Sequence, residues 1–309
     1  MKKKKIIIMI ILLLTLTTGC TKYLEDDDKK RITNEETGQA LTSNILCKPT
    51  DKDLLAIYEK YEDSMEVKLK DLPECSKMKI YDSKNYSGIW ANLFVVPLAW
   101  VIVKVGLLVK NYGIAVMLIG LALRLILMPF TLKTQRQSEN MKKAQPELAK
   151  LEKKYANKTD SDAMMQKSQE MMMIYKKYNI SPMGGCLVSF IQLPLFFAFL
   201  EAINRVPAIF EESLLTLQLG TTPLVGIKSG NYIYLILIAL IILTTYLSFK
   251  FSMASSGSSE QQQQMQFMTT FMLIFISIAS FSLPTAIALY WIVTNGFSVI
   301  QTLIFRKRR

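Results

Sequence analysis

Long runs of apolar residues recur along the chain after residue 110. The run Gly113–Phe130 contains a single charged residue, Arg124. Its eighteen residues would form a helix of about 27 Å, close to the hydrocarbon thickness of a bilayer. The pattern predicts an all-α integral membrane protein with a bundle of five transmembrane helices. The first would cover residues 111–132, and the other four would lie within 182–305, at Met183–Leu200, Tyr232–Phe249, Phe267–Leu283 and Thr285–Phe305.

A further apolar block, residues 90–110, is interrupted by Pro97 and Lys104. It could cross the membrane or lie along its surface as an interfacial helix. Loop charge favours the surface, because residues 133–181 carry eleven Lys/Arg against six Asp/Glu and positive loops stay in the cytoplasm. With an outside N-terminus, residues 111–132 then make the first crossing, and the basic tail 306–309 is cytoplasmic.

The N-terminus resembles a secretory signal, predicted over residues 1–19. A basic start precedes the apolar run Ile6–Leu14, and small residues precede Cys20. This arrangement resembles a bacterial lipobox, in which the cysteine becomes the lipidated (palmitate-bearing) first residue of the mature chain. Thr17 departs from the pattern, since leucine is usual there. An uncleaved anchor helix is the alternative to a lipid anchor in the cell membrane.

Residues 20–89 form a polar segment that we expect outside the cell. The charged run from Lys22 to Gln39 predicts a flexible tether. A helix is predicted over Thr50–Lys70, with Thr50 and Asp53 as a capping box.

Cys47 and Cys75 flank this predicted helix and could form a disulfide. An unbroken helix from Asp51 to Lys70 would span about 28 Å. The arms between the helix and the cysteines reach only about 27 Å when fully stretched. The disulfide and the full-length helix therefore almost exclude each other, and the sequence leaves the choice open.

The basic segment 133–181 predicts a cytoplasmic helical hairpin, with its turn at Asn157–Asp160. Apolar residues recur at helical spacing on both arms: Met141, Leu148, Leu151 and Tyr155, then Met164, Met171, Tyr175 and Tyr178. The methionines could simply seal the hairpin or could form an adaptable docking surface for apolar nascent segments. The basic charge could be solvated, or could meet anionic lipid or ribosomal RNA.

Polar residues inside the apolar runs are the candidate functional residues. Arginine stays charged at physiological pH, so Arg124 either snorkels to the membrane interface or faces a wet, protein-lined recess. Polar side chains in lipid should likewise face protein or water. The last helix carries a polar stripe, and a stripe plus a charge on another helix favours a shared recess. The candidates are Arg124, Gln192, Ser248, Trp291, Thr294, Asn295 and Gln301.

Composition argues against familiar catalysis. The net charge is +12, and the chain has no histidine, which excludes Ser-His-Asp and Cys-His nucleophilic sites and His-ligated zinc. Its four cysteines are too scattered for a metal site, and no phosphate-binding glycine loop is present. We therefore expect neither an enzyme nor a bound metal or cofactor.

Three motifs in order resemble the YidC/Oxa/Alb family of membrane protein insertases, Gram-positive lipoprotein branch. The resemblance covers about residues 90–305. The motifs are Leu123–Pro129 (LRLILMP), Ser181–Cys186 (SPMGGC) with Ile191–Pro194 (IQLP), and Leu283-Pro284 with Ala288–Asn295 (ALYWIVTN).

The resemblance implies five spans around a polar groove that opens to the cytoplasm and lipid but is closed outside. Arg124 would attract acidic residues of client tails, and Trp291 would line the groove. The implied function is insertion and folding of membrane proteins, and possibly lipoproteins, with or without the Sec translocon. Implied partners are nascent membrane proteins with short acidic outer tails, the translocon, membrane lipid and the ribosome, but no DNA.

Two departures from the family bear on these expectations. Ser248 stands where relatives often have glutamine, and the tail ends at Arg309, so ribosome binding should be weak. Two other functions stay open: a small-anion transporter or channel, and a structural membrane lipoprotein scaffold.

Overall fold

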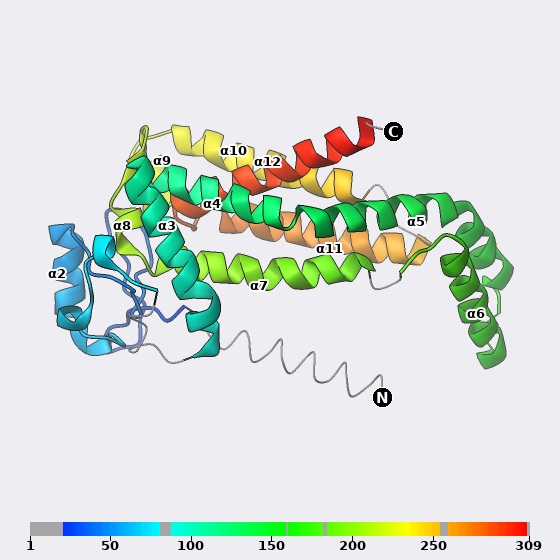
Figure 1. The fold of residues 1–309 in the computed structure, drawn as a ribbon, viewed down its shortest axis with the longest axis horizontal. Helices are drawn as coiled ribbons and strands as arrows, with labels where there is room; N and C mark the ends of the chain where they lie inside the picture. Colours follow the sequence, from blue (N-terminus) through cyan, green and yellow to red (C-terminus); the bar gives the residue numbers. More distant parts are fainter. Residues whose placement is uncertain (1–20, 81–87, 159, 182–183, 254–258, 308–309) are drawn as a thin grey trace. The chain divides into compact units, whose positions relative to one another are not determined.

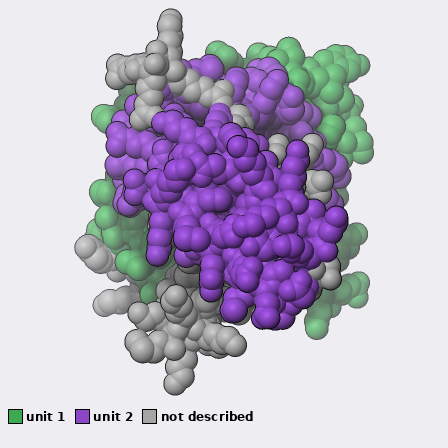
Figure 2. All heavy atoms as spheres, turned by 90° about the vertical axis from the view of Figure 1, so that its right-hand side faces the viewer, with its two compact units in different colours: residues 1–121, 192–239, 279–293 green, residues 122–191, 240–278, 294–309 purple. Residues whose placement is uncertain are grey.

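The computed structural model describes residues 21–80, 88–158, 160–181, 184–253 and 259–307. In this part the chain is mainly helical (Figure 1). It divides into two compact units, which Figure 2 colours separately. Unit 1 consists of residues 1–121, 192–239 and 279–293, and unit 2 consists of residues 122–191, 240–278 and 294–309.

The apolar runs form long helices. They are the π-helical η6 (Ala91–Val95), α3 (Val96–Val109), α4 (Tyr112–Ile126), α7 (Gly184–Asn204), α10 (Ile233–Met253), α11 (Ser259–Ala279) and α12 (Thr285–Lys307). The turn from α3 to α4 depends on Gly106, where a Cβ atom would lie 2.2 Å from the ring of Tyr112. Lys110 completes this turn in the left-handed conformation, with φ 57°.

Three stretches of the described chain are long and apolar enough to cross a membrane, namely Ala91–Val109, Ile233–Phe251 and Thr285–Phe305. The bent pair α4–α5 would make a fourth. Shorter apolar helical stretches cover Pro194–Asn204 and Thr270–Ala279. The bundle of five crossings stays a prediction. The block expected on the membrane surface, residues 90–110, is itself long enough to span.

Residues 21–80, which we call the cap, are folded within unit 1, so the prediction of a flexible tether is wrong. Leu24 is fully buried, and its N–H donates to the carbonyl of Leu41 at 2.8 Å. Isolated β-bridges join Tyr23 to Thr42 and Thr33 to Ala40. A single apolar residue such as Leu24 can therefore fix a charged run in place when it packs against the rest of the unit.

The helix predicted over Thr50–Lys70 is much shorter, because α2 covers only Lys52–Lys60. Asp51, rather than Thr50, caps it and accepts from the N–H of Leu54 at 2.8 Å. Beyond α2 the buried residues alternate with exposed ones, a period that suits an extended chain. These buried residues are Met65, Val67 and Leu69. Short 3₁₀ turns complete the cap: η2 (Glu62–Ser64), η3 (Leu69–Asp71) and η4 (Cys75–Lys77).

With the helix shortened, the geometric objection to the disulfide disappears. Cys47 and Cys75 are joined, with their Cα atoms 4.8 Å apart. The adjacent backbone pairs as well, because the N–H of Lys48 donates to the carbonyl of Pro73 at 2.8 Å.

Residues 205–232, which we call the connecting segment, link α7 to α10 and pack against the cap. They contain α8 (Pro207–Phe210), the antiparallel pair β1 (Ser213–Leu214) and β2 (Leu217–Gln218), and α9 (Pro223–Lys228). The N–H of Thr222 donates to the carbonyl of Thr37 at 2.8 Å. The approach is close, since a Cβ atom on Gly38, at φ 70°, would lie 2.6 Å from Thr222 and from Val225.

In unit 2, α5 (Met128–Tyr155) and α6 (Ser161–Lys177) pack antiparallel, and we call them the α5–α6 pair. Their buried contacts come from Ala144, Leu148, Leu151, Tyr155, Ala163, Tyr175 and Ile180. Glu147 pairs with Lys177 at 2.5 Å and Glu170 with Lys154 at 2.6 Å. Met164, expected on the packed face, is 56% exposed instead. The cytoplasmic placement of this pair stays a prediction.

Candidate functional site

Arg124 lies in the last turn of α4, next to a sharp bend. Helices α4 and α5 meet at an angle of 57° around Leu127, so the helix breaks within the predicted first crossing, residues 111–132. Pro129 explains the position of the bend, because proline has no N–H to donate and its ring clashes with the carbonyl four residues earlier. Arg124 is half-buried, and its Nε atom is inaccessible to solvent.

The polar stripe on α12 contacts neighbouring helices within unit 2. Asn295 Nδ2 donates to Thr245 Oγ1 on α10 at 3.0 Å. Gln301 Nε2 donates to Thr131 Oγ1 on α5 at 2.9 Å. One turn further along α5, Gln135 Nε2 donates to Thr302 Oγ1 at 3.1 Å. The stripe therefore joins α12 to both α5 and α10 through side-chain hydrogen bonds.

These polar groups are mostly shielded from solvent. Thr294 is 2% exposed, Thr245 2% and Gln301 7%, whereas Ser248 and Asn295 are half-buried. Unit 2 thus combines a half-buried guanidinium with amides and hydroxyls between its helices. Such groups can stabilise a carboxylate or a peptide group that enters a region of low polarity.

Not all of the predicted site residues come together. Arg124, Ser248, Thr294, Asn295 and Gln301 belong to unit 2, whereas Trp291 belongs to unit 1. There the Trp291 ring packs on Phe196, with ring centroids 5.3 Å apart. The side chain of Gln192 and the whole of Cys20 lie outside the described residues.

The sequence analysis missed a second polar cluster, which lies in unit 1. Glu201 and Arg205 are each 4% exposed, and Arg205 Nη2 donates to Glu201 Oε1 at 2.5 Å. Trp90 Nε1 donates to the other carboxylate oxygen at 2.9 Å. The i, i+4 spacing of Glu201 and Arg205 is a signal that could have revealed the pair. Among the residues that the structure describes, no three potential metal ligands come together.

Proteins similar to this chain align with most of its length. The model of the 60Kd inner membrane protein family matches residues 104–309. The chain is 36% identical over 241 residues to the membrane protein insertase YidC of Oceanobacillus iheyensis, across 76% of this chain and 91% of that protein. It is 36% identical over 218 residues to the YidC insertase of Alkalihalophilus pseudofirmus, across 70% and 81%. A crystal structure of an active YidC insertase, with its first transmembrane domain resolved, is 21% identical, with a TM-score of 0.48 over 72% of this chain and 47% of the other.

Proposed function

This chain belongs to the family of membrane protein insertases that includes YidC, and from that membership we propose that Arg124 receives acidic client tails during insertion. Family members are cell membrane proteins and are not enzymes. The client tail would enter from the cytoplasm and pass the polar faces of α5, α10 and α12. No covalent bond changes during insertion. The protein would act by lowering the free energy of the client's polar tail in a region of low polarity.

The environment of Arg124 is the observation that carries this proposal. The guanidinium cannot shed its charge, and it is half-buried at the bend between α4 and α5. A client carboxylate about 4 Å away would gain about 4 kcal/mol at an effective dielectric constant of 20. That gain offsets part of the cost of moving the client's charge out of water.

The proposed topology has five crossings, a lipid-anchored Cys20 outside the cell and a cytoplasmic C-terminus. Placing α3 on the outer membrane surface is supported by its contacts with the cap. Lys104, in the middle of α3, donates to the carbonyl of Ser76 at 3.0 Å. A helix whose middle contacts the extracellular cap fits the membrane surface better than the bilayer core.

The α5–α6 pair would meet clients before they reach the membrane. Its α6 helix exposes four methionines, which adapt to varied apolar segments. They are Met164, Met165, Met172 and Met173. The proposed partners are nascent chains, the Sec translocon, anionic lipid and the ribosome.

The test follows insertion of a single-span client with a short acidic tail into vesicles that contain the purified protein. Arg124→Lys should keep most of the activity, Arg124→Ala should lose much of it, and Arg124→Glu should lose most. Arg136→Ala is the matched control, because Arg136 is an exposed arginine on the adjoining helix. Insertion that is equal for all four variants would refute the role of Arg124.

A further inference from the structure

The cap is held against the connecting segment at several places. At one end the N–H of Leu46 donates to the carbonyl of Arg205 at 2.7 Å, and at the other Thr222 binds Thr37. Between them lies Glu211, directly after α8. The first two contacts join backbone groups, which any sequence offers, whereas the contact at Glu211 depends on a carboxylate side chain.

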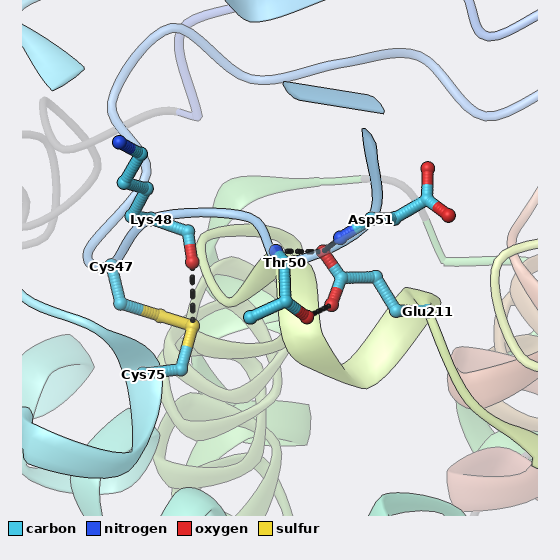
Figure 3. Close-up of a disulfide and its surroundings, with 6 residues drawn as sticks. All are labelled: Cys47, Lys48, Thr50, Asp51, Cys75 and Glu211. Atoms are coloured by element: carbon cyan, nitrogen blue, oxygen red, sulfur yellow. Dashed lines mark hydrogen bonds between the residues drawn. A yellow bond between two sulfur atoms is a disulfide. The ribbon is translucent and has the colours of Figure 1, made fainter. Parts of the chain in front are cut away.

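The carboxylate of Glu211 accepts hydrogen bonds from the start of α2 (Figure 3). Its Oε1 accepts from the N–H of Thr50 at 2.8 Å and from the N–H of Asp51 at 3.2 Å, and its Oε2 accepts from the Thr50 hydroxyl. The next residue, Glu212, accepts from the N–H of Tyr112 at 2.6 Å. Two consecutive carboxylates therefore tie the cap to the first residue of α4.

The disulfide fixes the backbone that Glu211 binds. Thr50 follows Cys47 by three residues, and the bond to Cys75 holds this strand beside residues 73–75. The cross-link closes a sequence separation of 28 residues, which removes much of the freedom of the open segment. In the closed cap Cys47 is 0% exposed and Cys75 4%.

We propose that the Cys47–Cys75 disulfide and Glu211 form a redox-dependent latch, closed when oxidised and released when reduced. Release would free the start of α2 and the contact at Tyr112. The latch rests on the proposed placement of the cap outside the cell, where disulfides persist.

The chemistry of the latch sets an order of events. The two thiols lose two electrons and two protons to an external protein or small-molecule disulfide, which leaves as two thiols. Because the closed cap buries both cysteines, oxidant and reductant alike react with them only while the cap is transiently open. Reduction takes two electrons and two protons from an external dithiol, which leaves as a disulfide, and the two free thiols keep the cap open. Oxidation therefore precedes closure.

Hydrogen exchange on the full-length protein in nanodiscs tests the latch. Dithiothreitol should speed exchange in peptides that cover residues 50–58 and 112–116 at least about tenfold, which corresponds to about 1.4 kcal/mol. Peptides from the α5–α6 pair should not change. Glu211→Gln should speed exchange in the same peptides without reduction, whereas Glu36→Gln, at an exposed carboxylate of the cap, should not.

A double variant, Cys47→Ser with Cys75→Ser, should show the hydrogen-exchange rates of the reduced wild type, and dithiothreitol should not change them. If the double variant does not fold, reduction of the folded wild type still decides the question. Two free thiols with unchanged exchange would overturn the latch, as would a Glu211→Gln protein that exchanges like the wild type. Client insertion is not the readout, so these results are independent of the role of Arg124.

Discussion

Arg205 and Arg124 lie in different units and differ in their burial and in the acidic residues near them in sequence. Arg205 in unit 1 is 4% exposed and binds Glu201, which precedes it by four residues. Arg124 in unit 2 is half-buried, and no Asp or Glu occurs between Tyr112 and Leu132. The sequence therefore places an acidic residue one helical turn from Arg205 and none within the helical stretch around Arg124.

If Arg124 receives client tails, as proposed, this difference separates a packing role for Arg205 from a recognition role for Arg124. A buried ion pair fixes the elements that carry it, here the end of α7 and, through Trp90, the start of η6. The positive field of Arg124 would attract the carboxylates of an incoming client tail.

The largest effect is expected from breaking the pair in unit 1. Arg205→Ala leaves Glu201 buried without its cation, which costs about 3–5 kcal/mol. The cap should then become sensitive to protease at a much lower denaturant concentration. Pulse proteolysis across a urea series measures this shift.

The control for this prediction removes both charges at once. A protein with Glu201→Met and Arg205→Met should recover most of the loss, because no uncompensated charge stays buried. Lys68→Ala, which breaks an exposed ion pair with Asp63, should leave the midpoint unchanged. A normal midpoint in Arg205→Ala would mean that the pair does not hold unit 1 together.

A double-mutant cycle tests whether Arg124 interacts with the carboxylates of the client. Arg124→Ala should lower insertion of the acidic client about tenfold, since 1.4 kcal/mol of lost attraction is enough. Replacing the client's carboxylates with amides should cause a similar loss in the wild type and little further loss in Arg124→Ala. Additive losses would show that Arg124 and the client's charges act separately.

The sequence predicted the helices better than it predicted their limits. Apolar runs located the long helices, and helical spacing located most of the contacts of the α5–α6 pair. The predicted helix over Thr50–Lys70 was too long, because the alternation of apolar Met65, Val67 and Leu69 with polar residues indicates an extended chain beyond α2. The sequence also failed to predict the folded cap, because a charged run folds only against a surface, the connecting segment, that local pattern does not reveal.

For the candidate site, periodicity identified the face of α12 but not its partners. The spacing of Asn295 and Gln301 put both on one stripe, yet only the fold shows that they bind Thr245 and Thr131. Grouping Trp291 with Arg124 came from the polar stripe on the last helix and from the family resemblance. Whether those two residues serve one groove stays a prediction.

The α5–α6 pair should respond to acid. Hydrogen bonds from Lys177 and Tyr178 lower the pKa of Glu147, and those from Lys154 and Tyr155 lower the pKa of Glu170. Because the folded pKa values lie below the unfolded value of about 4.3, this stabilisation is complete above that pH and is lost as pH falls through the folded pKa values.

Hydrogen exchange of the pair between pH 3 and pH 7, corrected for intrinsic rates, measures this loss. A variant with Glu147→Gln and Glu170→Gln should lose most of the pH dependence. Asp162→Asn, at an exposed carboxylate of α6, should keep it. A pair that opens equally at both ends of the range would contradict the assignment.

The smallest effect is expected from the stripe on α12. Asn295→Leu and Gln301→Leu each remove one interhelical hydrogen bond, worth about 0.6 kcal/mol on average in membranes. The shift in melting temperature should therefore be slight for each variant and nearly additive for both, since the two contacts involve different helices. Differential scanning fluorimetry in detergent measures this shift.

The same two variants decide whether the stripe has a structural role, as Arg205 has, or a role in client insertion, as proposed for Arg124. A purely structural stripe predicts a slight loss of stability and normal client insertion. A stripe that lines the client's path predicts an insertion defect larger than the loss of stability explains, and that defect should weaken for a client without acidic residues. Normal insertion in the double variant would confine the functional role in unit 2 to residues other than Asn295 and Gln301.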